Sequence, residues 1–593
     1  MKEFQPITQH LGRLFSHINP LRRRQFLVLL VLMILASFAE ILSIGAVLPF
    51  LAVLTSPQQF FEHSFVQPFI KVLGIKSADQ LLLPVTVAFG LATLIAGGMR
   101  LMLAWVLTRL AYATGADLTI SIYRRTLYQP YSVHVARNSS NVINTMITKV
   151  NETIVGTIIP VITIISSGIM LVFTLTFLLV IETKMMLIAV CGFGLIYVSI
   201  IKIFSKILIN NSQLIANESI KVIKLLQEGL GGIRDILLGG TQELYCKLYR
   251  KSDIPLRRAQ GTNIFLGQSP RFAIEALAMF FLAFFAYFLA LQPGGINQSL
   301  PLIGVLVLGA QRVLPHVQQG YSSWSSIQST RASVADTLDF LDQSMPEYAK
   351  QLHIESLPFQ KQIQLKQISF RYDSNSPWVL KDINLTIEKG SQVGFVGSTG
   401  SGKSTLIDIV MGLLQPEKGC LAVDAQVVTL DNFRSWQNHI AHVPQSIFLA
   451  DTSIEENIAF GIPKDQIDFK RVKLSAKKAQ IAEIIDTWPM KYQTNVGERG
   501  VKLSGGQRQR IGIARALYKQ ADVLIFDEAT SALDDDTERE VMQAINNLSD
   551  ELTIIMIAHR LTTLKNCTKI VELGDSRIRR IGNYQDIVSK MAF

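Results

Sequence analysis

Hydrophobic positions gather in six long runs in the first part of the chain, whereas the remainder has the short apolar runs of a soluble α/β domain. About 20 apolar residues are enough to cross a bilayer as a helix. Six such runs in succession are hard to accommodate as core helices of a soluble protein. We therefore expect a membrane domain with six transmembrane helices. The runs are Phe26–Thr55, Leu81–Leu107, Ile154–Ile181, Met185–Phe204, Phe272–Leu291 and Leu302–Val317.

The distribution of basic residues predicts the orientation of these helices. Lysines and arginines are frequent before the first run and in the loops 108–153 and 205–270, and sparse in the other loops. Basic loops remain in the cytoplasm, so both termini should be cytoplasmic. The two long loops have helical patterns. We expect the membrane helices to extend past the bilayer and to end in short helices, near Tyr131–Ser140 and Thr241–Tyr249, that contact the C-terminal domain.

Composition narrows the class of protein further. Only 17% of the residues are charged, and the net charge is +11. A nucleic-acid-binding protein would combine basic and aromatic residues in a recognisable module, and none is present. Basic cytoplasmic loops explain the charge better. Four scattered cysteines predict neither a disulfide framework nor a metal site. The polar start, Met1–Pro20, predicts no cleavable signal peptide.

The first functional motif in the second half of the chain is a phosphate-binding motif. The sequence from Gly397 to Ser404 has the pattern G-x-x-x-x-G-K-S, between an apolar run (Val393–Val396) and a helical pattern (Thr405–Leu414). This strand–loop–helix context is that of a P-loop, in which backbone N–H groups surround phosphate oxygens. Lys403 would reach the β- and γ-phosphates of ATP, and Ser404 would bind Mg²⁺. The predicted nucleotide-binding residues are Gly397, Ser398, Thr399, Gly400, Ser401, Gly402, Lys403, Ser404 and Thr405.

A second motif supplies acidic groups. The apolar run Val523–Phe526 ends in Asp527 and Glu528. A strand beside the P-loop would bring Asp527 close to Mg²⁺. Glu528 would then orient and polarise the attacking water. Together the two motifs predict an ATP hydrolase.

Leu503-Ser504-Gly505-Gly506-Gln507, between these motifs, resembles the signature motif of ABC transporters. The resemblance extends over residues 359–593. It implies that Tyr372 stacks on adenine, that Gln445 lies beside the nucleotide and binds Mg²⁺ with Ser404 and Asp527, and that Glu528 is the catalytic base. It further implies that His559, after the apolar run Ile554–Ile557, stabilises the transferring phosphate. The six-span region with two long cytoplasmic loops resembles the exporter type.

The resemblance also implies a dimer. In this family two ATP-binding domains pair head to tail, and each ATP lies between the P-loop of one copy and the signature of the other. The chain has one such domain, so we expect a homodimer with two competent sites. The expected architecture is a type I exporter-like membrane domain (1–341), a linker (342–358) and an α/β P-loop ATPase domain (359–593). The residues implied to contact ATP on the partner subunit are Ser504, Gly505, Gly506, Gln507 and Asp534.

Charged residues within the runs are the candidates for a substrate pathway. Charges inside a membrane are costly and usually functional. The candidates are Glu40, Arg100, Arg271 and Arg312. Guanidinium groups suit phosphate or pyrophosphate, because their planar fork binds anionic oxygens bidentately. The alternative is that these residues form structural ion pairs or lie beyond the bilayer on extended helices.

Short segments of the membrane half resemble bacterial flippases for lipid-linked oligosaccharides and related polysaccharide and glycolipid exporters. This resemblance implies ATP-driven flipping or export of a lipid-linked, phosphate-bearing glycan across the bacterial inner membrane. A general lipid or multidrug exporter is the alternative. A peptide or protein exporter ranks lower, because no peptidase domain precedes the first run, and six spans argue against a non-transporting ATPase. The segments are Ser37–Ile41, Val47–Leu51, Pro270–Phe272, Arg312–Pro315 and the outer-loop segment Phe65–Gly74, for which we expect an amphipathic helix.

Overall fold

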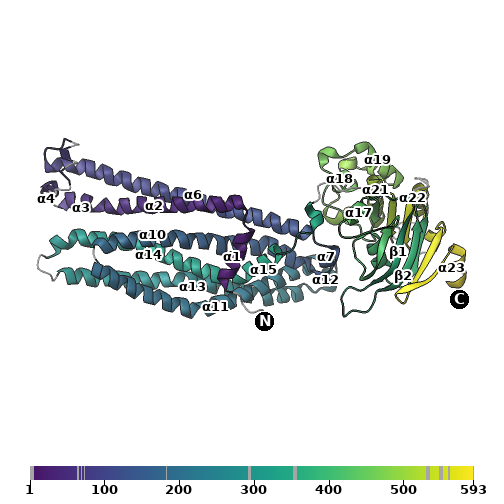
Figure 1. Ribbon diagram of the computed structural model, residues 1–593, viewed down its shortest axis with the longest axis horizontal. Helices are drawn as coiled ribbons and strands as arrows, with labels where there is room; N and C mark the ends of the chain where they lie inside the picture. Colours follow the sequence, from purple (N-terminus) through teal and green to yellow (C-terminus); the bar gives the residue numbers. More distant parts are fainter. Residues whose placement is uncertain are drawn as a thin grey trace. The chain divides into compact units, whose positions relative to one another are not determined.

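In the computed structural model the chain forms two compact units, each described here by itself (Figure 1). The helical unit comprises Met1–Tyr128 and Arg137–Ser344, and the sheet unit comprises Gln129–Ala136 and Met345–Phe593. The short segment Gln129–Ala136 therefore packs with the sheet unit, although it lies between two parts of the helical unit. The structure describes residues 6–591 except 56, 63–65, 68–69, 72–73, 182, 291–294, 351–356, 529–534, 547–551 and 559–560.

Long helices dominate the helical unit. α6 has 46 residues, and α11 and α13 have 49 each. At 1.5 Å per residue such helices are roughly 70 Å long, more than twice the thickness of a bilayer core. The predicted extension of the membrane helices beyond the bilayer is therefore confirmed. The unit contains α1 (Ile7–His17), α2 (Pro20–Gly45), α3 (Val47–Thr55), α4 (Pro57–Glu62), η1 (Ala78–Leu81), α6 (Leu82–Leu127), α10 (Ile159–Ile181), α11 (Thr183–Gly231), α12 (Ile233–Gly239), α13 (Gln242–Ala290), α14 (Gly295–Ser329) and α15 (Arg331–Leu341).

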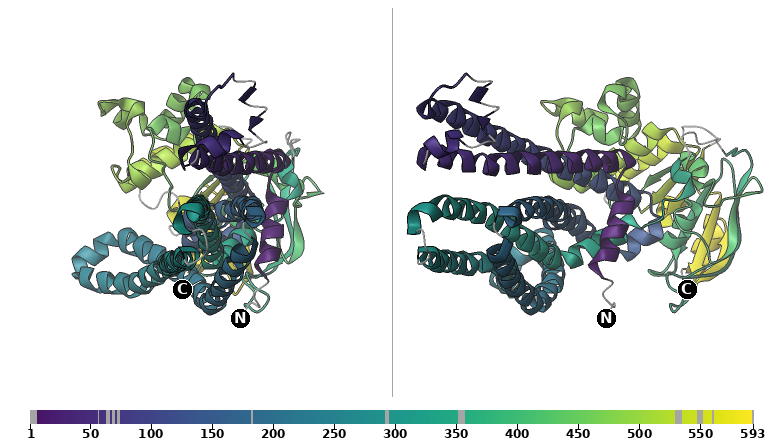
Figure 2. Two further views of the ribbon diagram at one scale, coloured as in Figure 1. Left: turned by 90° about the vertical axis from the view of Figure 1, so that its left-hand side faces the viewer. Right: turned by 60° about the vertical axis from the view of Figure 1, so that its left-hand side comes forward.

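The long helices pack in pairs. α2 lies against α6, α10 against α14, and α11 against α13, and Figure 2 shows these neighbours from two further directions. α13 also packs against α14, which connects the last two pairs. Buried apolar residues of α2, α6, α10 and α15 form the largest core of this unit.

The first predicted span is interrupted. It forms two helices, α2 and α3, which are separated at Ala46. Pro49 provides the reason, because it has no N–H to donate to the carbonyl of Gly45, one helical turn earlier. The hydrophobic pattern continues through the break, so periodicity alone did not reveal it.

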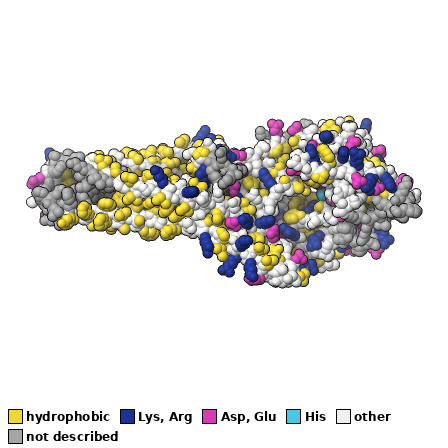
Figure 3. Space-filling view, turned by 90° about the horizontal axis from the view of Figure 1, so that it is seen from below, with side chains coloured by type: hydrophobic (Ala, Val, Ile, Leu, Met, Phe, Trp, Pro, Cys, Tyr) yellow, Lys and Arg dark blue, Asp and Glu magenta, His cyan; other side chains and the backbone are white. Residues whose placement is uncertain are grey.

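Four helical stretches of the described chain are long and apolar enough to cross a membrane: Pro20–Leu54, Ala78–Leu127, Ser139–Val180 and Cys191–Gly231. They overlap the first four predicted spans, the fourth only in its second part. The last two predicted spans fall in α13 and α14, except Leu291, which lies outside the described residues, and several residues of these helices have undescribed side chains. Large apolar side chains are exposed along α6 and α13. Figure 3 shows hydrophobic side chains covering much of one face of this unit, as expected for helices that contact lipid or a second subunit.

The chain that leads into the third span is irregular. Two π-helical turns, η2 (Thr145–Lys149) and η3 (Ile154–Ile158), flank the short helix α9 (Val150–Thr153). The helix α8 (Ser139–Asn144) precedes them, and α7 (Tyr131–Ala136) belongs to the sheet unit. The sequence predicted helix here but not the π turns.

The outer loop Phe65–Gly74 lies partly outside the described residues, so its predicted amphipathic helix is not fully traced. The described side chains of Val66 and Ile70 are buried with Val53 and Leu81 in a small apolar cluster. The cluster thus joins α3 to η1, which immediately precedes α6.

The sheet unit contains two sheets. The six-stranded sheet has the order β10-β9-β3-β8-β7-β6, in which only β10 is antiparallel to its neighbour. The four-stranded antiparallel sheet has the order β2-β1-β4-β5. The strands are β1 (Gln362–Phe370), β2 (Leu380–Glu388), β3 (Gln392–Gly397), β4 (Lys418–Val423), β5 (Gln426–Val427), β6 (Ile440–Val443), β7 (Val523–Asp527), β8 (Thr553–Ile557), β9 (Lys569–Gly574) and β10 (Arg577–Gly582).

The helices of this unit and the two sheets enclose two apolar cores, one on either side of the six-stranded sheet. Trp436 is fully buried in one of them, and its indole N–H donates to the carbonyl of Val410 (2.7 Å). The described helices include α16 (Lys403–Val410), α17 (Phe433–Asn438), α18 (Ile454–Ile458), α19 (Phe469–Lys478), α20 (Ala482–Thr487), α21 (Gly505–Lys519), α22 (Asp535–Asn546) and α23 (Tyr584–Met591), and the short turns η4 (Glu347–Lys350), η5 (Lys464–Gln466), η6 (Lys491–Gln493), η7 (Glu498–Gly500) and η8 (Leu561–Leu564).

Candidate functional site

The G-x-x-x-x-G-K-S segment connects the end of β3 to the start of α16, as predicted. Gly400 and Gly402 have φ values of +82° and +96°, which side chains disfavour. At Gly402 a Cβ atom would lie 2.9 Å from the carbonyl oxygen of Val379. The backbone of this loop therefore has its conformation only because glycine occupies these positions. The N-terminus of α16 adds partial positive charge at the same place.

Lys403 is the first residue of α16, and its side chain is buried. Its ammonium group donates to the carbonyl oxygens of Gly397 (2.8 Å) and Ser398 (3.0 Å). These contacts orient the charge across the loop. The Oγ atom of Ser401 is buried and has no hydrogen-bond partner among the described residues. A phosphate in the loop would satisfy such a group.

The acidic end of β7 lies at the same edge of the sheet as the P-loop. Asp527 is opposite Ile557 in the register of β7 and β8, and Ile557 is opposite Phe395 of β3. Glu528 follows with φ of +50°, a conformation that is costly for a residue with a side chain. Gln445 Nε2 donates to Glu528 Oε2 (2.6 Å). The structure thus brings together Glu528 and Gln445, which are 83 residues apart in the sequence.

Asp408, on α16, is an acidic residue that sequence reasoning missed. Burial and the negative charge of Asp527 raise the pKa of Asp408 to about 6. The carboxyl groups of α16 and β7 therefore interact electrostatically. The apolar pattern of α16 contained one carboxylate, and that anomaly was the available signal.

Tyr372 is 54% exposed, so its ring is accessible to a ligand. Its hydroxyl shares a hydrogen bond with the Thr405 hydroxyl (3.0 Å), and Phe370 packs edge-on against the ring. Tyr131 of α7 belongs to the same unit. Burial, and then the charges of Asp408 and Tyr372, raise the pKa of Tyr131. This agrees with the expectation that the first long loop contacts the ATP-binding domain.

Ser504 is the N-cap of α21, and it forms a capping box with Gln507. The backbone N–H of Gln507 donates to Ser504 Oγ (3.2 Å), and the backbone N–H of Ser504 donates to Gln507 Oε1 (2.9 Å). The N–H groups of Gly505 and Gly506 lie in the first turn, where a helix attracts anions. Two further predicted residues, His559 and Asp534, lie outside the described residues.

Two of the charged candidates in the spans form a pair. Glu40 of α2 is 1% exposed, and its Oε2 lies 3.3 Å from Nε of Arg100 on α6, whose side chain is 43% exposed. Arg271 and Glu275 form a second pair within one turn of α13 (3.2 Å), and both side chains are largely exposed. The side chain of Arg312 lies outside the described residues.

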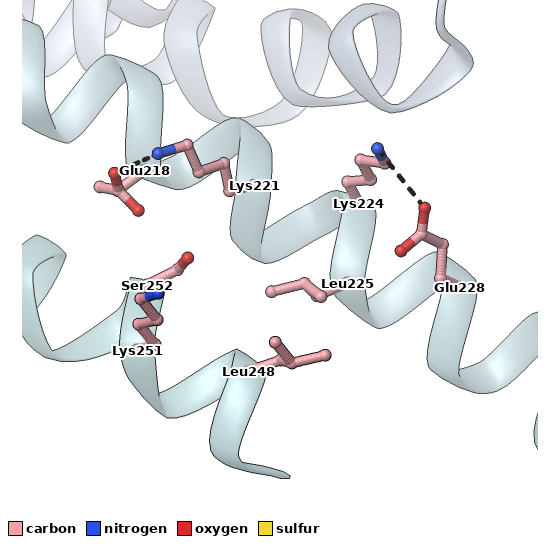
Figure 4. Close-up of a pocket in the computed structure, with 8 residues that line it drawn as sticks. All are labelled: Glu218, Lys221, Lys224, Leu225, Glu228, Leu248, Lys251 and Ser252. Atoms are coloured by element: carbon pink, nitrogen blue, oxygen red, sulfur yellow. Dashed lines mark hydrogen bonds and ion pairs between the residues drawn. The ribbon is translucent and has the colours of Figure 1, made fainter. Parts of the chain in front are cut away.

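A cavity of about 380 Å³ lies between α11 and α13, and none of the predicted site residues lines it (Figure 4). Lys221 pairs with Glu218 (2.7 Å), and Lys224 pairs with Glu228 (3.6 Å). These ion pairs largely neutralise the charge of its wall. The cavity contains none of the chemistry that the motifs predict.

Comparisons with known proteins agree with this geometry. Residues 380–531 match the model of the ABC transporter family, and residues 26–299 match that of the ABC transporter transmembrane region. The chain is 31% identical over 489 residues to the ATP-dependent lipid A-core flippase of Saccharophagus degradans, covering 80% of this chain and 79% of that protein. The chain is a member of the ABC transporter family.

Two further matches support the exporter type. The chain is 30% identical over 481 residues to the lipid A-core flippase of Francisella novicida, covering 79% of each chain. The structure of a bacterial Atm1-family ABC exporter with ATP bound has a TM-score of 0.77 and 22% identity, with 97% of each chain covered. The predicted fold class, a membrane domain followed by a P-loop ATPase domain, is confirmed.

These findings define the protein as an exporter-type half-transporter. Its ABC domain hydrolyses ATP, and the hydrolysis drives transport. A half-transporter has one ATPase domain and one membrane domain, and it works as a dimer. The exporter is a multi-pass membrane protein, since apolar helices form its first domain.

The raised pKa of Asp408 predicts a pH-dependent stability. The native state binds the Asp408 proton more tightly than the unfolded state, so this group's contribution to stability decreases as the pH rises from about 4 to about 6. Asp408→Asn should therefore raise the unfolding temperature of the nucleotide-free exporter above pH 6, and the gain should vanish towards pH 4. Thermal unfolding in detergent across this range measures the effect. The exposed residue Asp431 provides the control Asp431→Asn, and equal behaviour of both variants would contradict the assignment.

Proposed function

We propose that this ABC exporter flips or exports a lipid-linked, phosphate-bearing glycan, or a related glycolipid, across the bacterial inner membrane. It acts as a homodimer with both termini in the cytoplasm. The Glu40–Arg100 pair is the observation that carries the cargo assignment. The names of its relatives, lipid A-core flippases, support a lipid that bears sugar and negative charge.

The geometry of Arg100 suits an anionic cargo. Its Nε atom faces the buried carboxylate of Glu40, which orients the planar guanidinium group. Arginine has five N–H donors in a fixed fork, so the pair leaves the outer nitrogens for a second anion. The side chain is 43% exposed within a predicted span. A charged group is retained in such a place mainly where function requires it.

Arg271 is a weaker candidate for the same role. Its carboxylate partner, Glu275, lies on the same helix and is itself 44% exposed. Pairs of this kind stabilise a helix modestly and are neutral overall. An anion at Arg271 would therefore also meet the exposed carboxylate of Glu275, whereas the carboxylate partner of Arg100 is buried. Arg312 is retained as a candidate from the sequence.

We assign the roles in ATP hydrolysis from the motifs and their geometry. Glu528 is the catalytic base, and Gln445 holds its carboxylate in place. Ser404, Gln445 and Asp527 bind Mg²⁺, which polarises the phosphate oxygens when present. The exposed hydroxyl of Ser404 and the carboxylate field around Asp527 and Asp408 fit a hard divalent cation. His559 stabilises the transferred phosphate.

The second half of each ATP site comes from the other subunit. Ser504 of the partner subunit begins a helix, and the N–H groups of that helix end suit the γ-phosphate. Gly505, Gly506, Gln507 and Asp534 of the partner subunit complete the contact. Binding of ATP thus joins the two ATPase domains, and hydrolysis separates them. The adenine stacks on the accessible ring of Tyr372.

Glu528→Gln tests the assigned base. We expect steady-state ATP hydrolysis to decrease about 100-fold or more, because the amide accepts no proton from water, while the affinity for Mg·ATP remains close to that of the wild type. Hydrolysis and nucleotide binding are measured separately on the purified exporter. Retained turnover would show that another group activates the water.

The Glu40–Arg100 pair gives a test of the cargo. In proteoliposomes, a polyprenyl-pyrophosphate glycan should stimulate ATP hydrolysis of the wild type, and Arg100→Gln should reduce this stimulation about tenfold, more than it reduces basal hydrolysis. Arg257 pairs with Asp253 outside the predicted spans, so Arg257→Gln is the matched control. Stimulation by neutral drugs instead of the phosphorylated lipid would favour a multidrug exporter. Equal loss of basal and stimulated rates would indicate a folding role for Arg100.

A further inference from the structure

The chain passes between the helical unit and the sheet unit at three points. It leaves the helical unit after Tyr128, re-enters it at Arg137, and leaves it finally after Ser344. The segment that follows the re-entry runs through α8, η2, α9 and η3, and the segment before the final exit is α15. These two segments contact each other within the helical unit. Two of the three connections to the sheet unit, at Arg137 and at Ser344, are therefore the ends of the segments that form this interface.

Polar side chains make up much of the interface between α15 and the η2–α9–η3 segment. Lys149 pairs with Asp336, and the Ser333 hydroxyl donates to Glu152. From the first pair to the second, the residue number rises on one segment, from Lys149 to Glu152, and falls on the other, from Asp336 to Ser333. The two segments therefore run antiparallel. Two hydroxyl pairs complete the set: Thr153 with Thr337 (3.1 Å) and Thr157 with Thr330 (2.9 Å). We call these eight residues the α9–α15 polar interface.

This interface is closely packed. The threonines Thr153, Thr157 and Thr337 are fully buried, and Lys149 is 1% exposed. The Thr330 hydroxyl donates to the carbonyl of Gly156 (3.0 Å), and a Cβ atom at Gly156 would lie 2.3 Å from Cγ2 of Thr330. The two segments therefore approach each other as closely as glycine allows, so their register is specific.

The same contacts would also allow α15 and the η2–α9–η3 segment to separate. The Thr153 hydroxyl also lies within hydrogen-bond distance of the carbonyl of Lys149 (2.8 Å) on its own segment, and the Thr337 hydroxyl lies equally close to that of Ser333 (2.8 Å). Each hydroxyl has one proton, so donation within the segment and donation across the interface are alternatives. Thr330 has a similar alternative in the carbonyl of Ser326 (3.0 Å). If the segments part, the hydroxyls of Thr153, Thr337 and Thr330 each retain an acceptor on their own segment, so these three donors avoid the penalty for an unsatisfied buried group.

The π turns add a second reason to expect motion. A π turn contains one residue more than an α turn, and such turns are frequent at functional sites. η2 and η3 lie directly before and after α9. The four residues of α9, which include Glu152 and Thr153, are thus joined at both ends to backbone that is less regular than an α-helix. Conversion of either turn to α-helix would shift α9 relative to α15.

We propose that the α9–α15 polar interface is a latch that opens and closes in each ATP cycle. The latch connects the chain segment that returns from the first cytoplasmic loop to the segment that leads into the linker. Its contacts are polar and register-specific, so it has discrete closed and open arrangements. This role concerns the hydrolysis cycle and is independent of the cargo.

A reversible cross-link tests the latch. The full-length exporter is prepared with its four native cysteines replaced and with the pair Thr153→Cys and Thr337→Cys introduced. Oxidation to the disulfide should reduce ATP turnover at saturating Mg·ATP about tenfold or more, and reduction should restore it. The pair Thr157→Cys and Thr330→Cys is a second version, for use if the first disulfide forms poorly. The native cysteines are Cys191, Cys246, Cys420 and Cys567.

The matched control is a pair that joins two other long helices. Asn211 of α11 donates to Asn263 of α13 (2.8 Å), and the corresponding double cysteine variant should keep its turnover when oxidised. Full activity of the cross-linked Thr153–Thr337 variant would overturn the proposal, since a static contact tolerates a covalent bond. Equal inhibition of the Asn211–Asn263 variant would overturn it too, because the effect would then not be specific to this interface.

Discussion

The parallel register of β6, β7, β8 and β3 is the constraint on which the ATP site depends. Parallel strands end at a common edge of the sheet, so every residue that follows a strand end is delivered to the same place. The P-loop follows β3, Asp527 ends β7, and Gln445 lies two residues beyond β6. Distant motifs become neighbours in this way, and the hydrogen bond between Gln445 and Glu528 is the direct result.

The sequence predicted this part well because each motif carries its own local geometry. An apolar run, a glycine-rich loop and a helix define β3 and α16 without reference to the rest of the chain. Prediction failed for properties that depend on contacts between residues distant in the sequence. The raised pKa of Asp408 depends on burial and on Asp527, which is remote in sequence. The hydrophobic pattern continues across the break at Ala46, so it gave no sign of the break. Proline interrupts the helix there only because it lacks a backbone N–H.

The membrane half follows a different rule. Hydrophobicity predicts where its helices lie in the sequence, but not which helices pack against each other. Lipid-facing and partner-facing apolar residues have the same composition, so spans were predictable and pairings were not. The charged residues illustrate this. The sequence could name Glu40 and Arg100, and could offer both an ion pair and a substrate role. The structure pairs them, and the unequal burial of the two side chains leaves the guanidinium group accessible. An ion pair and an anion site are therefore compatible at this position.

The same reasoning explains why a transporter would place polar contacts near the connections to its ATPase domain. A motor must return to its starting state many times, so the free energies of its alternative packings need to be close. Threonine hydroxyls with acceptors on both their own helix and the neighbouring one meet this condition, whereas interlocked leucines do not. In the helical unit, the apolar core residues Val334 and Leu338 of α15 alternate with Ser333 and Thr337. One helix thus combines apolar residues buried in the main core of the unit with polar residues that contact the segment from η2 to η3.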